Sequence, residues 1–196
     1  MICGINKKTN SANLYLYNSR ELTMNNQTTI LNYSWLSTPI GSMLAVASDT
    51  ALYVLKFIEE HELEHELTQL TKQTKSTIIP GRTQPIDSIE QELQLYFAGS
   101  LKKFTTPLHI IGTPFQQTVW QTLTNVPYGC IMSYAQEARM LNKPSAYRAV
   151  ANANGSNNFV IIIPCHRIIQ SNGKIGGYGG GINRKQWLLE HEQKHL

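Results

Sequence analysis

The chain is poor in cysteine, with three among its 196 residues, at positions 3, 130 and 165. The count is odd and the spacing is wide, which is typical neither of a disulfide-dense scaffold nor of a CxxC metal-binding pattern. The simplest interpretation of any one of these cysteines is a small buried hydrophobic residue. A functional role for one of them therefore needs further evidence from its neighbours in the sequence.

Long hydrophobic runs are also missing. No window approaches the ~20 continuous apolar residues of a membrane span, and the N-terminus lacks the apolar region of a secretory signal. We therefore predict a cytoplasmic protein with no membrane partner, a nuclear one being the alternative. Residues 1–24 are polar and rich in Asn and Ser. They predict an N-terminal extension ahead of an α/β domain at 25–108 and a further domain at 109–196.

Acidic residues are scarce in the second half. Residues 109–196 carry eight Lys and Arg against three Asp and Glu, a net charge of +5, whereas residues 1–108 have a net charge of −1. This asymmetry suggests an anionic partner for the C-terminal half. Taken alone it is a weak signal, because many basic proteins bind no nucleic acid.

The first half has a β-rich pattern followed by helical periodicity. Short β-rich runs separated by turn residues span residues 30–58. Leucines at helical spacing follow over residues 63–70. Asp87 with Glu90 indicates a capping box for another helix that ends at Gly99. We therefore expect a small unit built from an antiparallel sheet of three or more strands with helices.

The second half is predicted to be mostly helical, with one strand at residues 159–163. The overall class is then α+β: an N-terminal antiparallel sheet with helices, followed by a mostly helical C-terminal domain with a helix-turn-helix. Each predicted helix begins at a capping or proline signal: Thr113 with Gln116, Ser133 with Gln136, Pro144, and Asn183 with Gln186.

The segment HELEH, His61 to His65, matches the HExxH pattern of zinc proteases. The buried stripe of this helix includes Leu63, and both histidines lie about 200° from it at 100° per residue. They therefore point to solvent among glutamates. A catalytic zinc also needs a shielded pocket and a third ligand, and neither is indicated, so we predict no metal site.

Two short helices, Ser133–Leu141 and Pro144–Asn154, are joined by a tight turn and resemble a helix-turn-helix. The second helix is rich in alanine, and so slim enough to enter a DNA groove, and it carries Arg148. An ordinary helical hairpin, with its alanines packed inward and Arg148 solvated, fits the spacing equally well. The spacing alone leaves both interpretations open.

The stretch IIIPCHRIIQ delivers Cys165, His166 and Arg167 directly after an apolar run that breaks at Pro164. A thiol becomes a useful nucleophile as the thiolate, which a nearby imidazole favours. The alternative is a buried cysteine beside a structural histidine. Three features weigh against it: the preceding buried run, the glycine-rich loop nearby, and a carboxylate at Glu192 that could orient an imidazole.

Further motifs surround this stretch. PCHRII is preceded by GTPFQQTVW, VPYGCIMSYAQ and YRAVANANGSN, and is followed by GYGGGINRKQWLLEHE. Together they resemble the O6-alkylguanine-DNA alkyltransferases, also called methylated-DNA–protein-cysteine methyltransferases, over about residues 113–193. The N-terminal half fits only loosely, as the variable domain of that family.

The resemblance implies a set of catalytic residues. Cys165 would be the acceptor thiol, and His166 the base that deprotonates it through a bound water. Glu192 would orient that histidine, and Asn157 would brace the turn that leads to the cysteine. Tyr134 would help to turn the nucleotide out of the helix and support the leaving guanine.

The resemblance also implies a DNA-binding and substrate-binding surface. Arg148 would be the finger that fills the gap left in the base stack, and the recognition helix would enter the minor groove. The implied protein is a monomer without cofactor or metal, and its partner is double-stranded DNA containing O6-alkylguanine. The remaining implied residues are Tyr134, Ser145, Ala149 and Asn152 at the DNA, and Ile168, Tyr178 and Gly179 in the substrate pocket.

The implied reaction is a stoichiometric transfer of the alkyl group to Cys165, with O4-alkylthymine as a poorer substrate. The product is a thioether, which has no carbonyl for water to attack, so each molecule would act once. One alternative is a protein that binds and flags alkylated bases without chemistry. A second is a cysteine hydrolase with a triad of Cys165, His166 and Glu192.

The chain departs from the usual family pattern at five positions. Glu137 stands where leucine is usual, and Asn142 where glycine is usual at the turn. None of the five touches the acceptor chemistry. Tyr147 and Ala151 bear on DNA docking, and Asn158 follows Asn157 in place of the usual proline.

Overall fold

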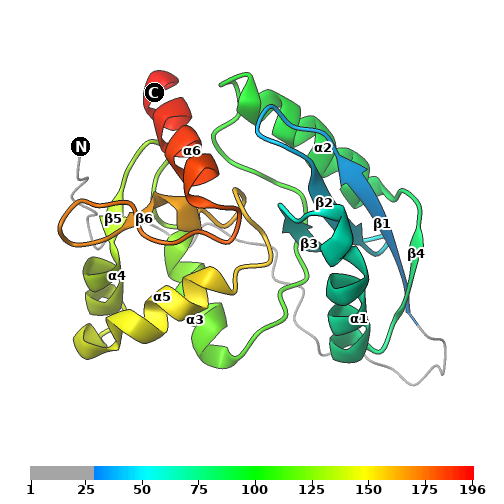
Figure 1. Cartoon of the computed structure of the whole chain (residues 1–196), viewed down its shortest axis with the longest axis horizontal. Helices are drawn as coiled ribbons and strands as arrows, with labels where there is room; N and C mark the ends of the chain where they lie inside the picture. Colours follow the sequence, from blue (N-terminus) through cyan, green and yellow to red (C-terminus); the bar gives the residue numbers. More distant parts are fainter. Residues whose placement is uncertain (1–28) are drawn as a thin grey trace.

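The computed structural model describes residues 29–196, so the predicted extension at 1–24 lies outside the described residues. The N-terminal part combines four strands with two α-helices (Figure 1). Its elements are β1 (Ile30–Leu36), β2 (Met43–Ala47), β3 (Leu52–Lys56), the 3₁₀ helix η1 (Glu60–Glu62), α1 (Leu63–Thr74), β4 (Thr77–Pro80) and α2 (Gln84–Phe97).

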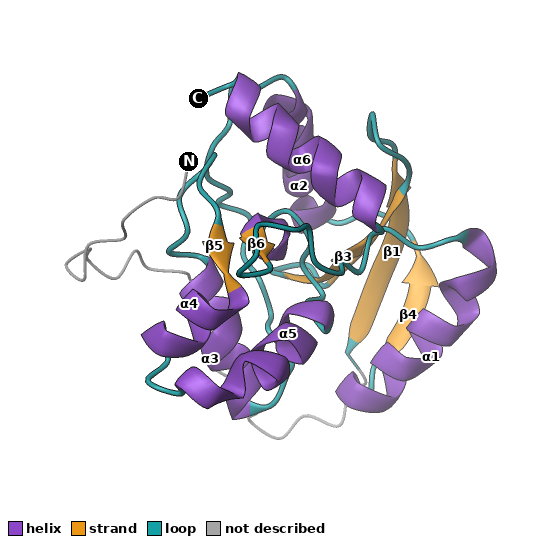
Figure 2. Ribbon diagram, turned by 60° about the vertical axis from the view of Figure 1, so that its left-hand side comes forward, coloured by secondary structure: helices purple, strands orange, loops and turns teal. Residues whose placement is uncertain are grey.

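The C-terminal part is mostly helical, which confirms the α+β prediction. In Figures 1 and 2, α6 lies above the small β5–β6 pair, and α3, α4 and α5 lie below it. Its elements are α3 (Pro114–Leu123), β5 (Met132–Ser133), α4 (Tyr134–Met140), η2 (Pro144–Ala146), α5 (Tyr147–Gly155), η3 (Cys165–Arg167), β6 (Ile168–Ile169) and α6 (Ile182–Lys194).

Strand β2 organises the N-terminal sheet because both of its faces are buried. Successive side chains of a strand point to opposite faces. Met43, Ala45 and Ala47 join the main core, which continues into the C-terminal part. Leu44 and Val46 join a smaller core that α1 closes with Leu70. The sheet is therefore covered on both faces, and one of them faces the rest of the molecule.

The sheet is mixed, with strand order β3-β2-β1-β4. The predicted antiparallel pairing holds for β1 with β2 and for β2 with β3. Strand β4 was not predicted, and it runs parallel to β1. A parallel neighbour requires a crossover connection, which α1 provides. Because β4 has four residues and ends at Pro80, it makes a short edge strand with little periodicity to detect.

Two of the predicted capping boxes are present. The Thr113 hydroxyl accepts from the Gln116 backbone N–H, and the Gln116 side chain accepts from the Thr113 N–H. Ser133 and Gln136 form the same pair at the start of α4. These caps satisfy backbone donors that the first turn of a helix leaves free. Pro144 begins η2, and the α-helix follows from Tyr147.

Two other predicted helix starts are wrong. Helix α2 begins at Gln84, and the side chains of Asp87 and Glu90 both bind Arg82 instead of forming a capping box. Helix α6 begins at Ile182, one residue before the predicted Asn183 cap. Its N-cap is Gly181, whose φ of 91° favours glycine.

The strand predicted at residues 159–163 is also wrong. Phe159 makes only an isolated bridge to Leu55, after which the chain turns and Ile163 N–H donates to the Phe159 carbonyl. Ile161 has a φ of 74°, which costs a β-branched residue of the order of 1–3 kcal/mol. The apolar residues are buried as expected, but a short buried run does not by itself distinguish a strand from a packed turn.

The two histidines of HELEH are exposed, His61 in η1 and His65 in α1, as the helical stripe predicted. Among residues 29–196, no group of three or more His, Cys, Asp or Glu is arranged to hold a metal ion. No helix in the same range is long and apolar enough to cross a membrane.

The Ser133 cap fixes the first turn of α4, which begins with Tyr134, so its loss should be measurable. We expect Ser133→Ala to lower the free energy of unfolding by about 1 kcal/mol, because one backbone donor loses its acceptor. Urea denaturation checks this value. Ser133→Thr keeps a hydroxyl acceptor and should retain most of the stability, and an equal loss in both variants would contradict the capping role.

Candidate active site

Cys165, His166 and Arg167 form the single 3₁₀ turn η3, directly after Pro164. Successive side chains on a 3₁₀ helix point about 120° apart, since the helix has three residues per turn. Three neighbours can therefore reach three different environments. All three are buried, so each environment must satisfy its own polar group.

Asn157 holds the turn that leads to the cysteine. Its Nδ2 donates to the Ile163 carbonyl at 2.8 Å and to Cys165 Sγ at 3.2 Å. Its Oδ1 accepts from the Phe159 N–H at 2.9 Å. One buried side chain thus ties both ends of the turn and touches the thiol. This geometry suits the predicted bracing role.

The Cys165 thiol is 5 % exposed. Burial raises its pKa to about 11, although the Asn157 hydrogen bond and the Lys185 charge act in the opposite direction. A thiol with such a pKa is protonated at neutral pH. The thiol is therefore unreactive at rest, and a base must take its proton when a substrate is in position.

His166 provides a base of suitable geometry. Its Nε2 lies 2.8 Å from Glu192 Oε1, and its Nδ1 is buried with no hydrogen-bond partner among residues 29–196. Burial lowers the pKa of His166, against the opposing effect of Glu192. The ring is then neutral, with its proton on Nε2 and a free lone pair on Nδ1. That lone pair can accept a proton.

Glu192 of α6 is the centre of this network. Its Oε1 accepts from His166 and from the Tyr96 hydroxyl at 2.9 Å, and its Oε2 accepts from the Gly129 N–H at 2.9 Å. Arg167 donates to both oxygens at 2.9 Å. Burial alone would raise the pKa of Glu192, but His166 and Arg167 hold it well below its usual range.

Arg167 and Tyr96 were not predicted as parts of the site. In the sequence, Arg167 stood out only as the neighbour of Cys165 and His166 in the stretch IIIPCHRIIQ. In the structure it binds Glu192 and also donates to the Val126 carbonyl at 2.6 Å. Tyr96 comes from α2 in the N-terminal part, 96 residues before Glu192. No sequence pattern connects two positions so far apart.

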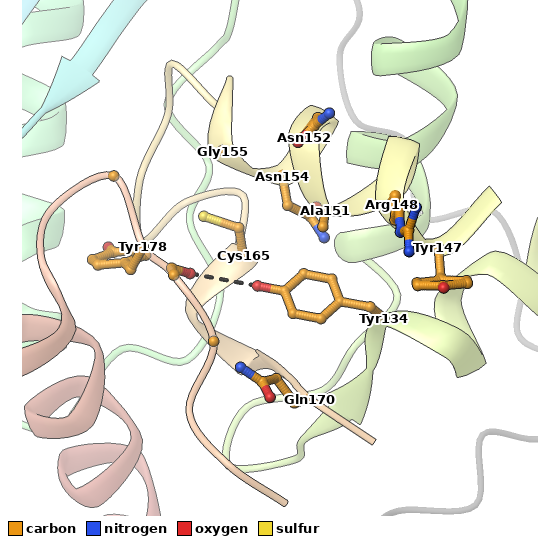
Figure 3. A pocket seen from close by; sticks show the side chains of 13 residues that line it. Tyr134, Tyr147, Arg148, Ala151, Asn152, Asn154, Gly155, Cys165, Gln170 and Tyr178 are labelled. Carbon is orange, nitrogen blue, oxygen red and sulfur yellow. Dashed lines mark hydrogen bonds between the residues drawn. The ribbon is translucent and has the colours of Figure 1, made fainter. Parts of the chain in front are cut away.

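A cavity of about 460 Å³ opens beside the thiol (Figure 3). The structure brings four predicted site residues together in its lining: Cys165, Tyr134, Tyr178 and Gly179. Ile168 is buried and is not among the lining residues. The remaining lining residues are Tyr147, Arg148, Ala151, Asn152, Asn154, Gly155, Gln170, Gly176 and Gly177.

Tyr134 and Tyr178, two of the three tyrosines that line the cavity, differ in their hydroxyl contacts. Tyr134 Oη donates to the Gly177 carbonyl at 3.4 Å, the dashed line in Figure 3. Tyr178 Oη is buried and has no hydrogen-bond partner in the described part of the chain. Burial raises the pKa of both phenols, so both are neutral donors at physiological pH. Each can offer a proton to a polar atom of a ligand.

Apart from Tyr134 on α4, the predicted DNA-facing residues lie on η2 and α5. Arg148 and Asn152 are exposed at the cavity, while Ser145 and Ala149 are exposed and are not among its lining residues. The Arg148 guanidinium lies 5.8 Å from the centre of the Tyr147 ring, and Tyr147 is 46 % exposed. The rim of the cavity is therefore a helix with an exposed cation and an exposed aromatic ring.

Lys185 of α6 is a further buried group that the sequence did not single out. Its Nζ donates to the Ile168 carbonyl and lies 3.4 Å from the Gly177 carbonyl. Burial lowers its pKa to about 8. These contacts connect the loop that carries Gly177 to α6. A lysine in a helical pattern usually indicates a solvated face, so its burial could not be predicted from the sequence.

The depressed pKa of Glu192 predicts an acid-sensitive fold. Its folded pKa lies below the unfolded value of about 4.3. The carboxylate therefore contributes its full stability above about pH 4.3, and this contribution declines as the pH falls below that value towards the lower folded pKa. We expect Glu192→Gln to lose about 3 kcal/mol or more at pH 7, because Arg167 keeps a buried, uncompensated charge.

Urea unfolding of the wild type and of Glu192→Gln between pH 3 and 7 measures this difference. The two curves should converge as the pH falls. Glu64→Gln, a change at an exposed position of α1, should follow the wild type throughout. A difference between the wild type and Glu192→Gln that stays constant over this range would contradict the assignment.

Two family models match the chain, and together they span most of it. The ribonuclease-like domain of 6-O-methylguanine DNA methyltransferase matches residues 31–110. The DNA binding domain of 6-O-methylguanine DNA methyltransferase matches residues 114–194.

Curated relatives named methylated-DNA–protein-cysteine methyltransferase agree with these matches. The Mycobacterium tuberculosis (strain ATCC 25618 / H37Rv) protein is 40% identical over 164 residues, which cover 84% of this chain and 93% of the relative. The Shigella flexneri protein is 40% identical over 166 residues, which cover 80% and 92%.

Solved structures give the same result. The O6-methylguanine methyltransferase of M. tuberculosis matches with a TM-score of 0.72 and 39% identity, over 85% of this chain and 94% of that one. A structure of M. tuberculosis OGT in complex with DNA matches with a TM-score of 0.70 and 38% identity over the same shares. With its fold, its motifs and relatives of this similarity in agreement, the chain belongs to the 6-O-methylguanine DNA methyltransferase family.

Proposed function

We propose that the protein repairs DNA by moving the alkyl group of an O6-alkylguanine onto Cys165 in a single turnover. The observation that carries this proposal is the position of the thiol. Cys165 Sγ is buried in the wall of a cavity whose rim is the exposed helix α5. A base that is turned out of a duplex bound at α5 would reach the thiol through this cavity.

The first step is removal of the thiol proton. His166 Nδ1 is the free acceptor, and Glu192 stabilises the imidazolium that results. A bound water would carry the proton from Sγ to Nδ1. The resulting thiolate has little solvation in the buried site, which makes it a strong nucleophile, and the cavity fixes its direction of approach.

The second step is an in-line displacement. The thiolate electron pair forms the S–C bond with the sp³ carbon of the alkyl group, while the C–O6 bond breaks and its electron pair stays with guanine. A proton donated to the departing guanine neutralises this charge, and the Tyr134 hydroxyl at the cavity is a candidate donor. The thioether product resists hydrolysis, so the protein is consumed in the reaction.

The alkylated base must leave the duplex before it can react, at a cost of a few kcal/mol. Arg148, exposed on α5 at the cavity rim, suits the role of filling the vacated space in the base stack. We propose that α5 docks in the minor groove, with Ser145, Ala149 and Asn152 at the DNA. Tyr178, Gly179 and the backbone near Ile168 would form the guanine pocket.

The same proposal includes the remaining sequence predictions. The protein acts as a monomer without a cofactor, its DNA is double-stranded, and O4-alkylthymine is a poorer substrate. The cytoplasmic location stays a prediction. Two rivals are a protein that only binds and flags lesions and a cysteine hydrolase. The buried thiol with its histidine base is unnecessary for flagging, and the helix-turn-helix is unnecessary for a hydrolase.

A mass measurement separates these alternatives. After incubation with duplex DNA that carries O6-methylguanine, we expect the protein to gain one methyl group, and peptide mapping to locate it on Cys165. The yield should stop at one methyl per molecule of protein. Tight binding with no mass change would support flagging, and transfer that survives in Cys165→Ala would contradict the proposed mechanism.

Arg148 gives an independent test. We expect Arg148→Ala to weaken binding to lesion-containing duplex by about tenfold, because flipping loses its compensating contact. Fluorescence of 2-aminopurine opposite or beside the lesion should report less extrusion of the base. Lys72→Ala removes the same charge from the exposed face of α1 and should bind like the wild type. Equal losses of DNA affinity in both variants would mean that Arg148 contributes only through its positive charge.

A further inference from the structure

Glu137 is a buried acid that the proposed mechanism does not use. It lies on α4, the first helix of the helix-turn-helix, and its side chain is 0 % exposed. Burial of a carboxylate is costly unless a cation or several donors compensate for the lost water. No cation forms an ion pair with Glu137 among the described residues.

Among the described residues, the Glu137 side chain has one hydrogen-bond partner, Asn154, near the end of α5. Asn154 Nδ2 donates to Glu137 Oε2 at 2.7 Å, and Asn154 is 5 % exposed. Two buried oxygens are left without a partner, Glu137 Oε1 and Asn154 Oδ1. Two hydrogen-bond acceptors cannot form a hydrogen bond with each other unless one of them carries a proton. One proton placed between them satisfies both.

Among the described residues, the elements packed against α4 place no buried cation beside this pair to neutralise the charge. Helix α3, which packs on α4 and α5, has no ionisable residue in its sequence, and neither has β5 or η2. The cations of α4, α5 and the turn between them, Arg139, Arg148 and Lys143, are exposed to solvent. The charge of Glu137 raises the pKa of two titratable groups, Cys165 and Tyr134, and neither of them is a cation.

We propose that Glu137 is held as the neutral carboxylic acid and returns a hydrogen bond from Oε1 to Asn154 Oδ1. The acid and the amide then form a reciprocal pair, in which each side chain donates once and accepts once. This pair locks the first helix of the helix-turn-helix to the end of the DNA-facing helix. Glu137 is thus a positioning residue for α5.

The pair also fixes part of the active-site wall. Asn154 lines the same cavity as Cys165 (Figure 3). A charged Glu137 would raise the pKa of the thiol and of Tyr134, and so would oppose formation of the thiolate. The neutral acid removes that repulsion. This consequence for alkyl transfer rests on the proposed function, whereas the protonation of Glu137 does not.

The direction of the pH dependence follows from burial, which raises the pKa of Glu137 to about 8. Between the unfolded value of about 4.3 and about 8, the folded chain keeps a proton that the unfolded chain has lost. The stability that this group contributes therefore declines as the pH rises across this window. Above about pH 8 the acid ionises in the folded protein, and the pair opens.

Glu137→Gln is the decisive variant, because a glutamine amide can donate and accept like the neutral acid but cannot ionise. Infrared spectroscopy at pH 7 should show the carbonyl band of a protonated carboxylic acid in the wild type and not in Glu137→Gln. Glu64→Gln, at an exposed position of α1, should keep the band. A spectrum that is unchanged by Glu137→Gln would overturn the proposal, whatever the activity of the protein.

Single-turnover alkyl transfer provides the functional arm. The ratio of the wild-type rate to the Glu137→Gln rate should fall about tenfold between pH 7 and 9, as the protonated fraction falls. The urea midpoint of Glu137→Gln should also rise relative to the wild type from pH 5 to 8. A rate ratio independent of pH would overturn the link to transfer. A protein with the infrared band but no transfer would contradict the proposed function alone.

Discussion

The active site depends on one buried carboxylate that is saturated with donors. Glu192 accepts from His166, Arg167, Tyr96 and the Gly129 backbone, which belong to η3, α2 and the loop before β5. Such a cluster holds the carboxylate ionised despite its burial. Its negative charge fixes the histidine tautomer and leaves Nδ1 free. The N-terminal part, although it is far from the cavity in sequence, thus contributes through Tyr96 to the position of the base.

The Cys165 thiol, unlike the Glu192 carboxylate, is held in its protonated form. It receives one side-chain hydrogen bond, from Asn157, and burial raises its pKa to about 11, so it stays protonated. The chain holds it there by a turn in which Ile161 has a positive φ, at a cost that the packed core must offset. A rigid, buried thiol suits a residue that must react once with one substrate, because it is protected from other electrophiles until the cavity is filled.

The features that could be predicted from the sequence have local causes, although two local capping signals, at Asp87 and at Asn183, were misleading. The capping boxes at Thr113 and Ser133 depend on residues three positions apart, and the exposed face of His61 and His65 follows from helical periodicity. Features that depend on distant contacts were missed. The parallel pairing of β4 requires the α1 crossover, and the roles of Tyr96 and Lys185 arise only when α2 and α6 pack against η3. The Ile run was correctly expected to be buried, but burial did not determine its backbone conformation.

The comparison of Glu137 with Glu192 shows what determines the charge of a buried acid in this protein. Both side chains are 0 % exposed. Glu192 has five donated hydrogen bonds, two of them from a guanidinium, and it is ionised. Glu137 has one donor, the uncharged amide of Asn154, whose own oxygen needs a proton, so it is neutral. The number and charge of the donors, not the depth of burial, decide between the two states. Each state suits its position: the ionised acid lies behind the histidine that must become positive, and the neutral acid lies where a charge would oppose the thiolate.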